Sequence, residues 1–182
     1  MRTFHSDLSW NLLVAAPVAG TSTFRKSVIF LFEDNAEVAM GVIINRPLNK
    51  CIAELSDITP NGNLGSIDVY EGGPVGANEL KLGMFVLDDS EVGSFHYGVT
   101  PQKLDLLMNS PYTLKPMAFL GCACWGRQQL RDEIKSGIWL TSNVDMNIIF
   151  DTPPDELWQT LLTREFPPIA DLEQPDGNFK SN

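Results

Sequence analysis

Residues 28–44 read VIFLFEDNAEVAMGVII, which is two short apolar runs on either side of a polar stretch. Runs of this length that are rich in β-branched and aromatic residues are typical of buried strands. The stretch between them, Glu33 to Glu37, has the length and composition of a hairpin turn. We therefore predict an antiparallel hairpin over about residues 27–44, closed by Asn45-Arg46-Pro47 because proline cannot donate to a sheet ladder.

Further strands and helices are predicted on both sides of this hairpin. Thr100-Pro101 and Thr152-Pro153 have the composition of helix starts, and Gly137 is a typical helix stop. Strands expected at 117–120 and 138–141 flank a helix expected at 128–136, and this order indicates a βαβ-like unit. We expect strands at 12–16, 67–70, 84–87, 117–120 and 138–141, a short helix at 52–55, and longer helices at 101–108, 128–136 and 153–166.

The composition is that of one acidic globular domain. The chain has 182 residues, 43% of them hydrophobic, and a formal net charge of −10. We expect a single domain over residues 1–168, and an acidic, loosely held tail over residues 169–182. The negative charge and the lack of any Lys/Arg run argue against direct nucleic-acid binding.

No apolar run approaches the ~20 residues of a membrane helix, and the N-terminus does not have the pattern of a secretory signal. The three cysteines are an odd number, which argues against a disulfide framework and agrees with a reducing compartment. We therefore expect a cytoplasmic protein with no membrane partner. No sequence motif indicates a cofactor or a metal, and the oligomeric state is not determined.

Cys122-Ala123-Cys124 is the first candidate for chemistry, because we expect it between a buried strand and a helix. A thiol at a helix N-terminus has a lowered pKa. The alternative is that both cysteines are small residues that fill a tight turn. The span from Gly121 to Gly126 is similar to a nucleophile elbow, but its glycines are one residue too far apart, and His96 precedes it in the chain, contrary to hydrolase order.

Glu71-Gly72-Gly73-Pro74 and Arg46 are the candidates for binding. Paired glycines can present backbone N–H groups to an anion, although a tight turn with positive φ requires the same residues. A guanidinium at a strand end could hold a carboxylate or a phosphate, or could pair with a structural acid such as Glu71. The sequence leaves both alternatives open.

The chain resembles the AlgH/YqgE family of bacterial proteins over roughly residues 10–162. The resemblance rests on the order and spacing of several short segments. These are 12–17, 24–28, 41–47, 72–75, Leu120-Gly121, Trp125-Gly126, Gln129-Leu130, Glu133, Trp139-Leu140 and 149–151.

This resemblance implies a compact α/β domain of the α+β type. Its sheet would be bent, partly split and largely antiparallel, closing toward a pseudo-barrel, with about three to four helices packed on it. Members are usually described as uncharacterised proteins or as proposed transcriptional regulators linked to alginate control, so the resemblance implies no reaction.

This chain departs from the family pattern at several positions. Relatives carry Cys-Glu-His-Asn where residues 32–35 read Phe-Glu-Asp-Asn, and an arginine where this chain has Lys26. Cys122-Ala123-Cys124 replaces an aromatic-small-Gly turn, and Arg127-Gln128 replaces a small-Gly pair.

The leading hypothesis is a non-enzymatic regulatory or binding domain for a small anion or a partner's carboxylate. Its site would be a cleft where three turns meet, with Arg46 supplying the positive charge. The alternative is a thiol-dependent enzyme or redox protein that uses Cys122 or Cys124. The residues expected at the cleft are Asn45, Arg46, Gly72, Gly73, Pro74, Trp125 and Gly126.

Overall fold

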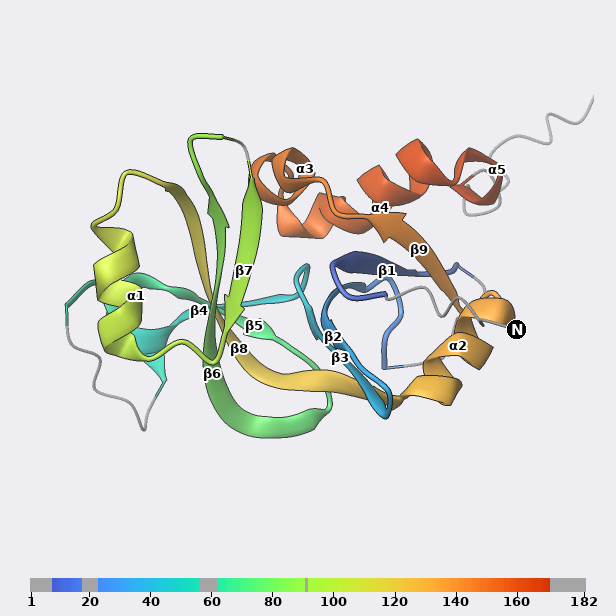
Figure 1. Cartoon of the computed structure of the whole chain (residues 1–182), viewed down its shortest axis with the longest axis horizontal. Coiled ribbons are helices and arrows are strands. Elements are labelled where there is room, and N and C mark those ends of the chain that lie inside the picture. Colours follow the sequence, from blue (N-terminus) through green and yellow to red (C-terminus); the bar gives the residue numbers. More distant parts are fainter. Residues whose placement is uncertain (1–7, 18–22, 56–61, 91, 171–182) are drawn as a thin grey trace, which may run out of the picture.

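The computed structural model describes residues 8–17, 23–55, 62–90 and 92–170. In this part of the chain, nine strands form one open sheet with the order β4-β5-β8-β3-β2-β1-β9, and β6 pairs with β7 and β8 (Figure 1). The strands are β1 (Asn11–Ala15), β2 (Val28–Asp34), β3 (Val38–Ile43), β4 (Pro47–Cys51), β5 (Asp68–Glu71), β6 (Val75–Leu87), β7 (Gly93–Tyr97), β8 (Thr113–Gly126) and β9 (Trp139–Asn143).

Five α-helices and two 3₁₀ helices complete the described part of the chain. The expected α+β class with a bent, largely antiparallel sheet is confirmed, and the sheet is not closed. Among the strand pairs described, only β5 with β8 is parallel. The helices are η1 (Ile52–Glu54), η2 (Gly62–Ser66), α1 (Pro101–Met108), α2 (Arg127–Lys135), α3 (Met146–Asp151), α4 (Pro154–Glu165) and α5 (Pro167–Ala170).

The predicted hairpin is confirmed as β2 and β3, which pair antiparallel. Asn35 fixes the turn, because its Oδ1 accepts from the backbone N–H groups of Glu37 at 2.9 Å and Val38 at 3.0 Å. Asparagine bonds to its own backbone two residues on more readily than most residues, which favours a turn at this position. The strand that follows Arg46 begins with Pro47 and lies at the edge of the sheet, as the missing N–H of proline requires.

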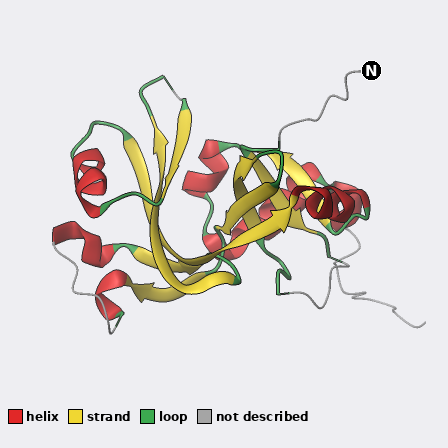
Figure 2. Ribbon diagram, turned by 60° about the horizontal axis from the view of Figure 1, so that its bottom comes forward, coloured by secondary structure: helices red, strands yellow, loops and turns green. Residues whose placement is uncertain are grey.

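The sheet is split into two lobes that share β8. The β1 lobe contains β1, β2, β3 and β9 with α2, α3, α4 and α5, and the β6 lobe contains β4, β5, β6 and β7 with α1. Residues 113–122 of β8 pair with β5 and β6, and residues 123–126 pair with β3, so this strand runs from one lobe into the other (Figure 1). Figure 2 shows the two groups of strands with helices beside each of them.

Three apolar clusters hold this arrangement together. The largest lies between the lobes and joins Phe30 and Val42 to Phe85 and Phe119, with Trp158 of α4 against them. The second packs α2 on the far face of the β1 lobe, and the third packs α1 on the far face of the β6 lobe. Each lobe therefore buries both faces of its sheet, which agrees with the continuous apolar runs of β1 and β2.

Local signals placed α1, α2 and α4 to within one residue. The Oγ1 of Thr100 accepts from the N–H of Lys103 at 3.3 Å and caps α1, and Gly137 follows α2 with φ +72°. The strand, helix and strand order of β8, α2 and β9 is also confirmed, but β3, β2 and β1 lie between the two strands. None of the helices in the described residues has the length and apolar character needed to span a bilayer.

The sequence patterns missed several elements. Strands β6 and β8 have 13 and 14 residues, far longer than the four-residue apolar runs that predicted them. The first part of β6 is exposed and polar, so it has no apolar pattern to detect. Strand β7 and helix α3 were not predicted. Most of the expected tail, residues 171–182, lies outside the described residues, while Ala170 belongs to α5 and is buried.

Candidate functional site

Asn45 is a buried clamp that holds the segment before β2. Its Oδ1 accepts from the N–H of Val28 at 2.7 Å, and its Nδ2 donates to the carbonyl of Lys26 at 2.9 Å. The side chain lies at the end of β3, and the residue is 8% exposed. A side-chain amide can bind one donor and one acceptor at once. Asn45 therefore satisfies backbone groups beside Lys26, where the chain turns with φ +55°.

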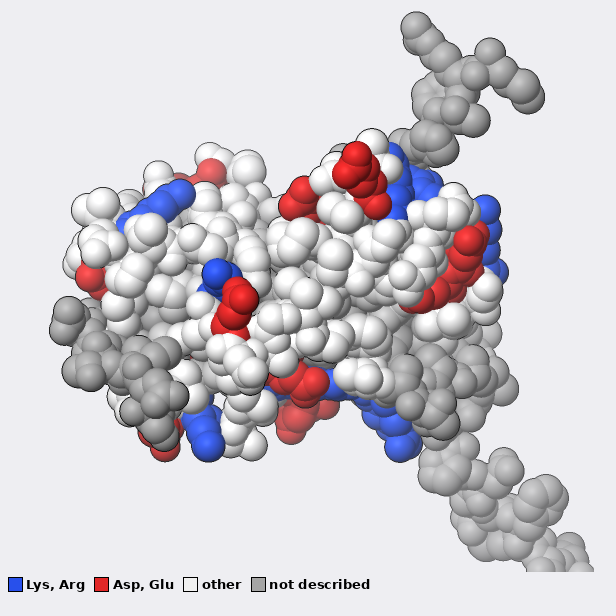
Figure 3. Space-filling view, turned by 90° about the horizontal axis from the view of Figure 1, so that it is seen from below, with Lys and Arg blue, Asp and Glu red and all other residues white. Residues whose placement is uncertain are grey.

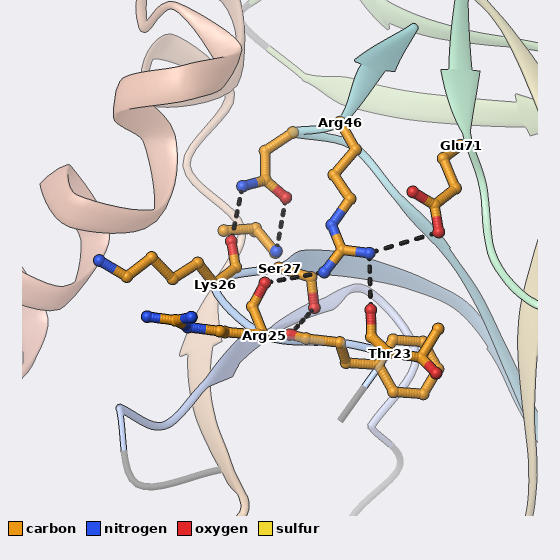
Figure 4. Close-up of polar contacts among 9 residues, drawn as sticks. Thr23, Arg25, Lys26, Ser27, Arg46 and Glu71 are labelled. Atoms are coloured by element: carbon orange, nitrogen blue, oxygen red, sulfur yellow. Dashed lines mark hydrogen bonds and ion pairs between the residues drawn. The ribbon is translucent and has the colours of Figure 1, made fainter. Parts of the chain in front are cut away.

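Arg46 binds the same segment from the other side (Figure 4). Its guanidinium donates through Nη1 to the carbonyl of Thr23 at 2.6 Å and through Nη2 to the carbonyl of Arg25 at 2.7 Å. Nη1 also lies 3.3 Å from Oε1 of Glu71. Of the two alternatives that the sequence left open, the structure contains the internal pair with Glu71. The side chains of Arg25 and Lys26 extend away from the Arg46 guanidinium.

A second set of contacts ties this segment to α4 and to the aromatic cluster beside α2. The ammonium of Lys26 lies 4.8 Å from the ring centroid of Trp158. Phe24 stacks on Trp125 with ring centroids 5.8 Å apart, and its ring meets Trp139 edge-on at 5.4 Å. Residues 23–28 therefore connect two of the motifs that the sequence singled out, Asn45-Arg46-Pro47 and Trp125-Gly126.

A recess opens beside Arg46, between β4, β5 and β8 of the sheet and the start of α4. Its volume is about 850 Å³. Three cationic and three acidic side chains line it, together with apolar groups and two asparagines. The lining residues are Asn45, Arg46, Pro47, Leu48, Asn49, Lys50, Asp68, Tyr70, Glu71, Lys115, Pro154 and Asp155.

Lys115 is the lining residue that sequence reasoning missed. It lies on β8, and its ammonium donates to the carbonyl of Ile149 in α3, so it joins the two lobes. Burial lowers the pKa of Lys115 from its usual range, and the nearby Asp151 carboxylate partly opposes this effect. The only sequence signal was a lysine within a stretch that is otherwise apolar, residues 114–120.

The turn of Gly72, Gly73 and Pro74 contacts the Arg46 region through its backbone. The N–H of Glu71 donates to the carbonyl of Arg46 at 2.9 Å, and the N–H of Gly72 donates to the carbonyl of Leu120 at 2.8 Å. A Cβ on Gly72 would lie 2.2 Å from the carbonyl oxygen of Gly121, and Gly73 has φ +149°. Close backbone packing thus accounts for both glycines, which supports the tight-turn alternative over an anion-binding nest.

Trp125 and Gly126 lie at the far end of β8. One carboxylate oxygen of Glu133 accepts from the indole N–H of Trp125 at 3.0 Å and from that of Trp139 at 2.8 Å. Gly126 is the N-cap of α2. Of the three turns expected to share one cleft, only Asn45-Arg46-Pro47 lines this recess. Asn45, Arg46 and Pro47 line the recess, whereas Gly72, Gly73, Pro74, Trp125 and Gly126 do not.

The expected placement of the cysteines at a turn before a helix is wrong. Cys122 and Cys124 lie within β8, which continues without a break through Gly126, so neither thiol sits at a helix N-terminus. Burial raises the pKa of the Cys122 thiol, although a hydrogen bond with Tyr97 partly opposes this effect. The prediction failed because β8 is a long strand that passes from one lobe to the other. Its sequence resembles two short elements with a glycine turn between them.

The hydrolase pattern has no structural counterpart around these cysteines. Residues 121–126 form strand rather than the strand-turn-helix of a nucleophile elbow. His96 lies on β7, where burial lowers its pKa, and its Nε2 is 3.5 Å from the Oγ of Ser94.

Comparison with known proteins places the chain in a family. The model of the AlgH-like family matches residues 12–168. The chain belongs to the AlgH-like family. It is 31% identical over 176 residues to a UPF0301 protein of Xanthomonas campestris, covering 90% of this chain and 92% of the relative. A UPF0301 protein of Thioalkalivibrio sulfidiphilus is 33% identical over 175 residues, covering 89% of this chain and 91% of the relative.

Two solved structures have the same fold. The solution structure of AlgH from Pseudomonas aeruginosa superposes with a TM-score of 0.67 at 27% identity, covering 98% of this chain and 99% of AlgH. A crystal structure of a Corynebacterium diphtheriae protein superposes with a TM-score of 0.69 at 19% identity, covering 96% of this chain and 95% of that protein. The second likeness shows the fold alone.

Proposed function

We propose that this AlgH-like protein is a non-enzymatic binding domain with a regulatory role. Its ligand is a small anion, or a carboxylate of a partner, held in the recess beside Arg46. The observation that carries the proposal is the ammonium of Lys115, which is partly buried at the wall of this recess. A cation that burial penalises gains from an anionic partner more than a fully hydrated one does.

The residues singled out in the sequence then have different roles. Arg46 lines the recess, where its positive charge is paired with Glu71, and its Nη1 and Nη2 groups hold residues 23–25 in place. Asn45 holds the Lys26 carbonyl, and the N–H of Glu71, next to the turn of Gly72, Gly73 and Pro74, binds the Arg46 carbonyl. Trp125 supports the same segment from the far end of β8 through Phe24, and Gly126 follows it as the N-cap of α2.

Contact with DNA is not part of the proposal. The chain carries a net charge of −10, and on the face drawn in Figure 3 acidic and basic groups alternate without a continuous basic surface. A surface of this kind does not favour binding to phosphate backbones. A regulatory role would therefore act through a bound ligand or a protein partner.

Lys115→Met tests the proposal, because methionine keeps the length of the side chain and removes its charge. Titration of the ¹⁵N-labelled wild-type protein with acetate at low salt should shift the amides of residues 45–50 and 68–71 in a saturable manner. Lys115→Met should weaken this binding at least about fivefold, the equivalent of ~1 kcal/mol.

Lys103→Met is the matched control, since Lys103 is exposed on α1 and does not line the recess. This variant should bind acetate as the wild type does. Equal binding by Lys115→Met and wild type, or no saturable shift at the recess, would show that the recess is not an anion site.

A further inference from the structure

The charges that line the recess come in opposite pairs. Arg46 and Glu71 bind each other, with Nη1 and Oε1 3.3 Å apart. Removing this pair leaves two ammonium groups and two carboxylates on the walls. The side chains of Lys50, Asp68 and Asp155 form no hydrogen bond or ion pair with any other described residue. Lys115 donates to the carbonyl of Ile149, which uses one of the three N–H donors of its ammonium. The recess therefore keeps two charges of each sign available to a ligand.

A ligand with several negative charges does not match this lining. Opposite charges on the wall cancel at a distance, so a dianion such as phosphate would gain from Lys50 and Lys115 and lose to Asp68 and Asp155. A ligand that carries one charge of each sign avoids this loss if each group meets its opposite.

Apolar groups lie among these charges. Pro47, Leu48, Tyr70 and Pro154 line the same recess, and Leu48 is 38% exposed. Such surfaces favour contact with methylene groups rather than with water. A ligand whose two charged ends are separated by a short aliphatic chain would use both the charged and the apolar parts of the lining.

We infer that the recess binds a chain-like zwitterion, with one carboxylate and one ammonium joined by an aliphatic spacer. The carboxylate meets Lys115, and the ammonium meets Asp155 at the start of α4. This inference rests on the proposed function and adds the cationic half of the ligand to it. A small ω-amino acid carries these groups, and so does a partner segment with Lys and Glu side chains.

Three compounds of the same length test the inference: 6-aminohexanoate, hexanoate and hexylammonium. NMR titration of the wild-type protein should give binding of 6-aminohexanoate about fivefold tighter than that of either analogue, which corresponds to the ~1 kcal/mol of one added ion pair. Lys115→Met should make 6-aminohexanoate no better than hexylammonium. Asp155→Asn should make it no better than hexanoate, while Asp105→Asn on α1, which does not line the recess, should change nothing.

The outcomes separate this inference from the proposed function. If hexanoate binds as tightly as 6-aminohexanoate, and Asp155→Asn has no effect, the zwitterion is wrong and anion binding stands. If none of the three compounds shifts the recess amides, both proposals fail. A capped Lys-Ala-Glu peptide distinguishes the source: tighter binding of the peptide than of 6-aminohexanoate supports a partner segment, and the reverse supports a free small molecule.

Discussion

The two sides of the recess differ in how their polar groups are used. On the Arg46 side, Asn45 and Arg46 make four hydrogen bonds to the backbone of residues 23–28, and a fifth contact goes to Glu71. On the opposite side, Lys115 makes one hydrogen bond to the backbone, and Asp155 lies at the start of α4 with its carboxylate available. The comparison teaches that the conspicuous polar motif maintains the fold, whereas the less conspicuous lysine is the better candidate for a ligand contact.

Asn45→Ala should have the largest effect on stability, because it removes the clamp on the Arg46 side of the recess. The change leaves the N–H of Val28 and the carbonyl of Lys26 without their partner; the Val28 group is buried, and a buried orphan costs ~1–3 kcal/mol, while the partly buried Lys26 carbonyl adds less. We expect the free energy of unfolding to fall by about 2–3 kcal/mol in urea denaturation. Asn78→Ala on the exposed part of β6 is the control and should change it by less than ~0.5 kcal/mol. A loss as small as the control's would show that Asn45 is not a structural clamp.

The cysteines offer a second comparison, between a buried and an exposed position on the same strand. In a Cys51→Ser background, Cys124→Ser reports on Cys122, and Cys122→Ser reports on Cys124. At pH 7.5 iodoacetamide should label Cys122 at least about tenfold more slowly than Cys124, because Cys122 is 8% exposed and burial raises its pKa.

The pH dependence follows from the sign of this shift. A thiol with a raised pKa stays protonated until the pH exceeds the usual value of 9.0, so labelling of Cys122 should still increase above that pH. Both cysteines should react equally in urea, which controls for local sequence. If labelling of folded Cys122 reaches a plateau below pH 8, its thiolate is stabilised, and the thiol-enzyme alternative regains support.

Glu71→Gln should have the smallest effect on stability, and it tests which contacts position Arg46. The Glu71 side chain is 41% exposed, and pairs of this kind contribute ~0–1 kcal/mol. The carbonyls of Thr23 and Arg25 still hold the guanidinium. We therefore expect the free energy of unfolding, measured in urea at low salt, to change by less than about 1 kcal/mol. A loss of more than ~2 kcal/mol would mean that the ion pair, and not the carbonyls, positions Arg46.

Local patterns predicted what depends on neighbouring residues. The hairpin of β2 and β3 follows from two apolar runs and an asparagine turn, and α1 follows from Thr100 and Pro101. Local patterns failed where one long strand pairs with different neighbours along its length. The last residues of β8 pair with β3 in the other lobe, so residues 121–126 were interpreted as a turn.

The sequence by itself determined the mixed α/β class, most of the strands and the longer helices, and a set of polar motifs at strand ends. Caps, turns and apolar spacing act over a few residues, so the order of amino acids is enough to find them. Only the tertiary structure decided which polar groups are used internally and which face a recess. Lys115 meets Ile149, 34 residues further along the chain, because two lobes fold against each other across β8. No local pattern contains a contact between such distant segments, since it depends on how the lobes pack.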